Sequence, residues 1–521
     1  MATSPETQTP LLDDVVDGTV DCQGHPVRRS TSGGWRAASF IIWVEVAERV
    51  AYYGISSNLI SFLTGPLGQS VATAAQNVNI WSGTASLLPL LGAFVADSFL
   101  GRYRTIFAAS LVYILGLGLL TVSAVLPSSE LQVLMFFFSL YLVAVGQGGH
   151  KPCVQAFGAD QFDRNYPEES KAKSSFFNWW YFGICAGPLL TLAVLDYIQD
   201  NLSWGLGFSL PFVVMVFALL IFLSGTRKYR FSIKGEEENA FGRIGKVFAA
   251  ALRNRRTTSL ATALEEESRG TLPHHSSEQF KFLNKALVAP DDLKDKGKLC
   301  SITEVEEAKA VLRLFPIWIT CLVYAIVFAQ FSTFFTKQGA TMDQTFVPAR
   351  SFTREPSGIT MLQRIGTGMF LSIICMVVAA LVEIQRLQTA KDYNLVDKPS
   401  ATVPMSVWWL VPQYSLIGLA DVFTMVGLQE FFYDQVPKDL RSIGLALYIS
   451  IFGVGSFLSS FLISVIEEAT SWAGHTSWFS NNLNRAHLDY FYWLLAVLSA
   501  VQFAIYICIA KSYIYNRGST V

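Results

Sequence analysis

The sequence predicts an all-α membrane protein built from two helical bundles. Of its 521 residues, 51% are hydrophobic and only 15% are charged, whereas a soluble domain carries about 25% charged residues. The apolar residues gather into runs long enough to cross a bilayer, which takes about 20 residues per helix. A hydrophilic stretch at 226–308 divides these runs into two groups. The net charge of −1 argues against nucleic acid as a partner.

Eleven runs qualify as membrane spans, six before the central stretch and five after it. The predicted spans lie at 37–63, 78–100, 105–126, 131–151, 175–197, 204–225, 310–336, 361–383, 405–430, 443–465 and 489–511. Lys and Arg are absent from the first and third connections but present in the second and fourth, which places the N-terminus and the central stretch in the cytosol. The expected parts are a disordered tail (1–35), a six-helix bundle (36–225), a central loop (226–308), a second bundle lacking one helix (309–514) and a C-terminal tail (515–521).

The first span carries three charges within one turn of helix. Glu45, Glu48 and Arg49 are spaced by three and four residues, which places them on one helical face. A charge in the middle of a bilayer costs at least about 2.5–3.5 kcal/mol on insertion scales, so these residues are functional candidates. Two carboxylates beside one guanidinium leave one acid free to exchange a proton, and Arg49 can also hold an anion. Tyr52 and Tyr53 follow as candidate substrate contacts; the alternative is an ion network that only fixes helix packing.

Ionisable residues also occur in two other spans. Lys151, at the end of the fourth span, is predicted to serve substrate or proton binding rather than only to reach the membrane interface. His150 is expected to be its neighbour and not a second proton site. On the second bundle, Glu430 lies among aromatic residues and is predicted to pair with Lys151, the alternative being a simply solvated acid. The role of Asp421 stays open.

Asp97, at the end of the second span, and Arg102, in the cytosolic turn that follows, are predicted to latch helix ends in one conformation. Thr105 follows Arg102 by three residues, a spacing that basic-directed kinases accept, and phosphorylation would add about −2 charge there. The seven cysteines show neither a CxxC pair nor metal-ligand spacing, so we interpret them as buried small residues rather than as disulfides or a metal site.

Three motifs carry a resemblance to a known family. They are Glu45-x-x-Glu48-Arg49, the run GAFVADSFLGRY that begins at Gly92, and the run KPCVQAFGADQFD that begins at Lys151. In this order they resemble the plant nitrate/peptide transporter family of proton-coupled oligopeptide transporters, within the major facilitator superfamily. The resemblance implies twelve helices in two bundles that rock around a central site, and proton symport without a cofactor. It also implies that Glu45 and Glu48 are proton sites, with Arg49, Lys151 and Glu430 near proton and substrate.

Two departures from the family bear on the substrate. Cys185 stands where peptide-carrying relatives have the asparagine that binds a peptide end, which counts against di- and tripeptides. Phe328 stands where the family's nitrate-binding histidine would fall, so nitrate would depend on Arg49, Lys151 or other donors. The substrate therefore stays open.

The second bundle is one crossing short. The loop with Arg350 and Arg354 should face the cytosol, whereas the span that ends near Lys337 should leave the membrane on the other side. Only about a dozen residues lie between them, too few to cross as a helix. The family's eighth helix belongs here, and Phe346 looks like its far end joined directly to Thr345, as a skipped coding segment would produce.

The leading hypothesis is a proton-coupled symporter of nitrate or another small solute, and not an enzyme. Its expected partners are protons, a small-molecule substrate, the lipid bilayer and a kinase acting on Thr105. The alternative is a non-transporting family member that lost a helix and keeps at most a regulatory role; peptides remain an alternative substrate. The segment from Glu6 to Leu12 resembles an acidic dileucine sorting signal, so the expected location is the vacuolar or the plasma membrane.

Overall fold

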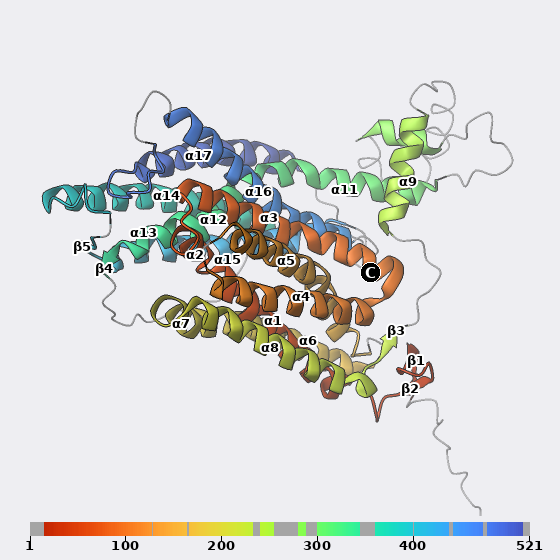
Figure 1. The fold of residues 1–521 in the computed structure, drawn as a ribbon. Helices are drawn as coiled ribbons and strands as arrows, with labels where there is room; N and C mark the ends of the chain where they lie inside the picture. The colour runs from red at the N-terminus through yellow and green to blue at the C-terminus, as the bar shows by residue number, and fades with distance from the viewer. Residues whose placement is uncertain are drawn as a thin grey trace, which may run out of the picture. The chain divides into compact units, whose positions relative to one another are not determined.

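Helices make up most of the computed structural model (Figure 1). The described chain forms two compact units, one from 1–68 and 87–237 and one from 69–86 and 238–521. The structure describes residues 15–127, 129–163, 166–232, 240–254, 280–287, 300–343, 360–399, 401–436, 441–471 and 477–513.

The first unit is a helical bundle in which α1 packs against α6 and α8, and α4 lies along α5. Its buried core is mainly aliphatic and aromatic, as expected for helices that are apolar along their whole length. Its helices are α1 Gly34–Ser56, α2 Leu59–Thr64, α4 Arg102–Val125, α5 Glu130–Ala159, α6 Pro167–Leu190, α7 Asp196–Asn201 and α8 Trp204–Ser224, with π-helical turns at Ala96–Leu100 and Thr191–Leu195.

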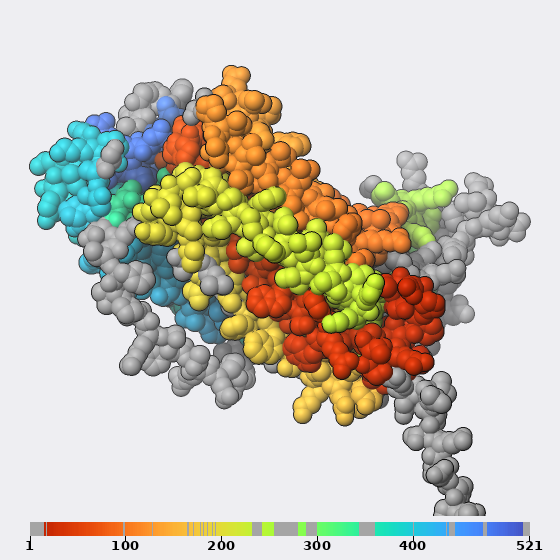
Figure 2. Space-filling model, turned by 60° about the horizontal axis from the view of Figure 1, so that its bottom comes forward, coloured from red at the N-terminus to blue at the C-terminus, as the bar shows by residue number. Residues whose placement is uncertain are grey.

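A small antiparallel sheet lies at one end of this bundle (Figure 1). Strands β1 (Val15–Val20) and β2 (Pro26–Arg28) form a hairpin, and β3 (Phe231–Ser232) pairs with β1. Figure 2 shows this N-terminal segment against the end of α8. The prediction of a disordered tail over 1–35 is therefore wrong for residues 15–33, because pairing with β3 satisfies backbone groups that a local sequence pattern leaves open. Residues 1–14, with the Glu6–Leu12 segment, lie outside the described residues.

The second unit pairs α14 with α15 and α17, and α12 with α16. Capping boxes fix the first turns of two of its helices, through Ser301 with Glu304 and Thr360 with Gln363. Its elements are α9 Ala240–Arg253, α11 Ile302–Thr320, α12 Leu322–Ala329, α13 Thr336–Ala340, α14 Met361–Asp392, α15 Val411–Asp434, α16 Arg441–Thr470 and α17 Leu488–Ser512, a π-helical turn Phe331–Phe335, and the parallel strands β4 Met342–Asp343 and β5 Val403–Ser406.

Helix α3 (Val71–Val95) is divided between the two units, since residues 69–86 belong to the second. Within that unit, Asn79 Nδ2 donates to Ser459 Oγ at 3.1 Å. The prediction assigned all of 36–225 to the first bundle, whereas residues 69–86 belong to the second unit. A local sequence pattern does not reveal this, because the contacts join residues that are far apart in the sequence.

The central loop is partly packed. Helix α9 is amphipathic and buries Val247 against Leu283 and Val305, the latter in α11. Helix α11 begins at Ile302, earlier than the predicted span at 310. The described part of the predicted solvated loop thus includes a surface helix, α9, that contacts the start of the second bundle.

Eight helices of the described chain are long and apolar enough to cross a membrane, or nine if the bent pair Ile302–Thr320 and Leu322–Ala340 counts as one span. Helix α1 falls outside this group because it carries the charges of Glu45, Glu48 and Arg49. The predicted junction of Thr345 with Phe346 lies outside the described residues, as do Arg350 and Arg354.

Candidate functional site

Glu45, Glu48 and Arg49 lie together on the buried face of α1. Their exposed fractions are 3%, 0% and 7%. Arg49 Nε donates to Glu45 Oε1 at 2.8 Å, and Arg49 Nη2 lies 3.0 Å from Glu48 Oε2. One guanidinium therefore bridges two carboxylates, and the three side chains carry one net negative charge when both acids are ionised.

Helix α5 adds a further donor to this group. Gln147 Nε2 donates to Glu48 Oε1 at 3.1 Å. In contrast, Glu45 Oε2 is buried and has no hydrogen-bond partner among the described residues. A buried carboxylate oxygen without a donor is costly in the ionised form, and a bound proton removes the charge. Glu45 Oε2 is therefore a candidate proton-binding atom.

The backbone of α6 lies directly against Arg49. A Cβ atom at Gly187 would lie 2.6 Å from Arg49 Cβ and 3.3 Å from the carbonyl oxygen of Val46. Because real side chains do not approach this closely, a larger residue at 187 would displace either the helix or the arginine. Glycine at this position thus lets two helices hold the guanidinium in place.

Lys151 on α5 brings a second cation to the same part of the first unit. Its side chain is half-buried, and it forms no ion pair within the described residues. Its charge acts electrostatically on Glu45, Glu48 and Arg49. The neighbouring His150 is fully buried, and neither of its ring nitrogens has a hydrogen-bond partner in the part of the chain that the structure describes.

Two tyrosines follow Arg49 on α1. The rings of Tyr52 and Tyr53 meet edge to face, with centroids 5.4 Å apart, and both are half-buried. Tyr53 lies within electrostatic range of Arg49. The structure thus brings five of the predicted site residues, from Glu45 to Tyr53, onto one helix.

Arg102 in the cytosolic turn has an acidic partner outside the local sequence that contains Asp97. Arg102 forms an ion pair with Asp160 at the end of α5. Asp97 lies in the π-helical turn Ala96–Leu100. Thr105 is only 5% exposed, and its hydroxyl donates to the carbonyl oxygen of Gly101 at 2.9 Å.

In the second unit, Glu430 forms an ion pair with an arginine of the same unit, which neither the predicted pairing with Lys151 nor the solvated alternative included. Arg364 Nη1 on α14 donates to Glu430 Oε2 at 2.7 Å, and the glutamate side chain is 42% exposed. Phe328 on α12 packs edge to face on Phe452 of α16 with centroids 5.3 Å apart. The local pairing with Arg364 was not predicted, because it depends on α14 lying along α15.

Asp421 is a half-buried acid that the predicted site did not include. It lies on α15, and the hydroxyl of Tyr324 on α12 donates to its carboxylate. Among the described residues, Asp421 has no cationic partner within ion-pair distance. An acid in the middle of an apolar span was the available signal, but its hydrogen bond with Tyr324 could be found only from the fold.

Comparison with known proteins agrees with this architecture. The model of the POT family (PTR2) matches residues 103–353 and 347–479. The Arabidopsis thaliana protein NRT1/ PTR FAMILY 5.10 is 62% identical over 99% of this chain and 98% of its own length, and NRT1/ PTR FAMILY 5.13 is 55% identical over 99% of each. The crystal structure of an auto inhibited POT family peptide transporter superposes with a TM-score of 0.70 at 20% identity, over 93% of this chain and 99% of that chain.

The membrane-crossing helices and these matches define a multi-pass membrane transporter and not an enzyme. The resemblance read from the three sequence motifs is thereby confirmed. The chain belongs to the POT family.

The same comparisons bear on the length of the second bundle. The alignment with NRT1/ PTR FAMILY 5.10 spans 558 residues, although this chain has 521. The family match also consists of two pieces, 103–353 and 347–479, which overlap over 347–353. This is the region in which the charge pattern calls for a further helix.

Proposed function

We propose that this protein is a proton-coupled symporter of nitrate or another small anion. The observation that supports it is the charge balance of Glu45, Glu48, Arg49 and Lys151, which sums to zero when all four are ionised. One bound proton leaves one net positive charge, and one monovalent anion restores neutrality. Because uncompensated charge in a membrane interior is costly, binding of the proton and binding of the anion favour each other.

Several features narrow the range of possible substrates. Phe328 packs against an aromatic neighbour and offers an anion no hydrogen bond. The predicted donors are therefore Arg49 and Lys151, of which Arg49 can present two parallel N–H groups to a planar anion. Cys185 in place of an asparagine argues against a peptide terminus. The names of the plant relatives, NRT1/ PTR FAMILY 5.10 and 5.13, do not decide between an anion and a peptide as the substrate.

The direct test is uptake of ¹⁵N-nitrate by oocytes that express the chain, measured at acidic and at neutral external pH. We expect faster uptake and an inward current at acidic pH, because a bound proton favours binding of the anion. A labelled dipeptide serves as the competing probe. Uptake of the dipeptide alone would contradict the anion assignment, and nitrate uptake without pH dependence would contradict proton coupling.

Asp421, rather than Glu430, is our candidate for the acid that serves transport in the second unit. Asp421→Asn should lower proton-driven uptake at least about tenfold, the effect of roughly 1.4 kcal/mol on an equilibrium. Glu430→Gln is the matched control, because Glu430 is already neutralised by Arg364 and is partly exposed. Equal losses in both variants, at equal surface expression, would remove the distinction between the two acids.

A second candidate function is that of a non-transporting family member. The split family match at 347–353 favours it, because loss of one crossing would invert the helices that follow. We predict that inserting the corresponding segment of NRT1/ PTR FAMILY 5.10 after Thr345 raises uptake at least about tenfold if the present chain is inactive. Equal uptake by both forms, above that of control oocytes and at equal surface expression, would show that the chain transports as it stands.

A further inference from the structure

Thr31 lies in an exposed turn between β2 and α1, shortly after two consecutive arginines in the sequence. Arg28 and Arg29 precede it by three and two residues. The Thr31 hydroxyl donates to the carbonyl oxygen of Arg28 at 3.3 Å, an exposed contact that constrains it little. A kinase that selects arginine at these two positions would therefore find the acceptor hydroxyl at the surface.

Thr105 also follows an arginine by three residues, but its hydroxyl is less accessible to a kinase than that of Thr31. It is 5% exposed, its hydroxyl is bonded to the carbonyl of Gly101, and the arginine three residues before it is engaged by Asp160. Phosphoryl transfer requires the hydroxyl to enter the kinase active site. Thr31 can do so by local movement of a turn, whereas Thr105 requires opening of a helix that packs on α5.

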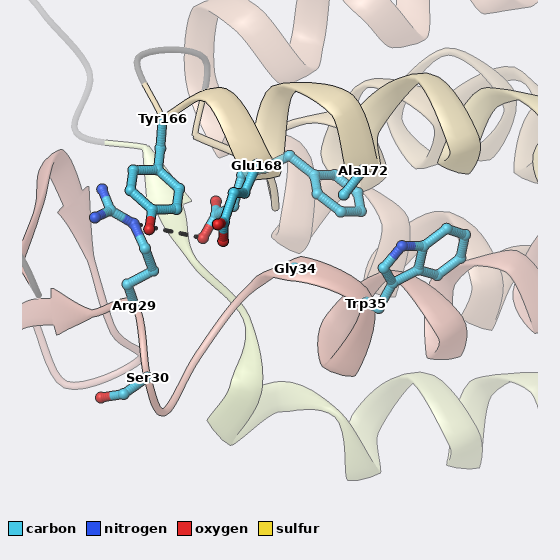
Figure 3. Close-up of a pocket in the computed structure, with 9 residues that line it drawn as sticks. Arg29, Ser30, Gly34, Trp35, Tyr166, Glu168 and Ala172 are labelled. Atoms are coloured by element: carbon cyan, nitrogen blue, oxygen red, sulfur yellow. Dashed lines mark ion pairs between the residues drawn. The ribbon is translucent and has the colours of Figure 1, made fainter.

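The cations around Thr31 divide into two groups. Arg29 is engaged, since it pairs with Asp163 at 2.7 Å and with Glu169 at 3.5 Å and lies over the ring of Tyr166. Figure 3 shows it extending toward Tyr166, while Ser30 points away. Arg28 and Arg36 are exposed and form no ion pair within the described part of the chain.

Arg36 already reaches this turn. Its Nη1 atom donates to the carbonyl oxygen of Ser30 at 2.6 Å. A phosphate on Thr31 would therefore have two arginines nearby in the chain, Arg28 before it and Arg36 after it, neither of which pairs with an acid among the described residues. Charge-assisted hydrogen bonds from arginine to phosphate are the usual way in which phosphorylation orders a segment.

We propose that Thr31 is a phosphorylation site for an arginine-directed serine/threonine kinase, with the phosphate held by Arg28 and Arg36 at the start of α1. Thr31 Oγ attacks the γ-phosphorus of ATP, the bond to the β-phosphate oxygen breaks, ADP leaves, and the hydroxyl proton passes to the base of the kinase. The product carries about −2 charge. It stiffens the entry to the helix that also carries Glu45, about 15–20 Å further along.

The test is phosphate transfer to the intact protein in lipid nanodiscs, with radiolabelled ATP, a purified kinase of this specificity and peptide mapping. We expect label on Thr31, at least about tenfold less in Thr31→Ala and in Arg28→Gln, and unchanged label in Ser30→Ala and Thr105→Ala. Label that persists in Thr31→Ala or maps to Thr105 would overturn the proposal. The assay needs no transported substrate, so its failure is separate from failure of the symport proposal.

A second measurement tests how the phosphate is held. Hydrogen exchange of residues 28–36 should slow at least about tenfold on phosphorylation, and this protection should be lost in Arg36→Gln while labelling persists. Faster exchange in the phosphorylated wild type would contradict the role of Arg28 and Arg36.

Discussion

Replacing Arg49 with alanine should abolish proton-driven nitrate uptake in oocytes while the protein still reaches the cell surface. The guanidinium bridges Glu45 and Glu48 within a buried part of α1. Without it, two carboxylates face each other in an environment of low polarity, and at least one must stay protonated. The site then loses both its exchangeable proton and its principal anion donor, so pH-dependent current and ¹⁵N-nitrate uptake should fall together.

Two further variants make this result specific. Glu45→Gln removes the carboxylate with the unbonded oxygen and should also abolish proton-driven uptake, because glutamine cannot exchange a proton. Arg364→Ala is the matched arginine control, since its ion pair with Glu430 is partly exposed and we expect most of the uptake to remain. Normal pH-dependent uptake in both Arg49→Ala and Glu45→Gln would refute the proposed site.

The cluster on α1 could be predicted because its information is local. Three charges in an apolar run stand out against the cost of burial, and spacings of three and four residues place them on one face. The same reasoning applies to most of the spans, because a long apolar run can be recognised from the sequence without knowing what it packs against. The family resemblance rested on continuous motifs for the same reason, and it supplied the architecture.

The features that could not be predicted depend on contacts between distant residues. Tyr324 and Asp421 are 97 residues apart, and Arg29 and Asp163 are 134 apart. Nothing in the local pattern around either acid names its partner. The β1–β2 hairpin is a similar case, because its polar sequence reads as disordered until β3 pairs with it.

Helix α14 shows how a charged residue near the end of a predicted span can be misread. The predicted span ends at 383, but the helix continues to Asp392, and both Glu383 and Arg386 are fully buried. Arg386 binds Glu383 through two parallel hydrogen bonds of 2.9 and 2.7 Å. It also donates to Asn484 Oδ1 at 2.8 Å and to the carbonyl oxygen of Leu483 at 2.6 Å.

This network should matter more for stability than any exposed ion pair of the chain. Removing one partner of a buried pair leaves the other charge uncompensated and typically costs about 3–5 kcal/mol. Glu383→Ala should therefore lower the unfolding temperature in detergent strongly, as followed by tryptophan fluorescence. Asp397→Ala is the exposed control, because its pair with Arg485 is 50–74% exposed and should contribute little.

The double variant Glu383→Met/Arg386→Met separates the pair's net contribution from the cost of an unpaired charge. Apolar residues of similar volume can replace a buried ion pair at little cost, so the double variant should be more stable than Glu383→Ala. Asn484 and Gln338 would each lose one partner in the double variant, which limits the recovery. A double variant less stable than Glu383→Ala would mean that the hydrogen bonds to these amides, and not the balance of charge, hold α14 in place.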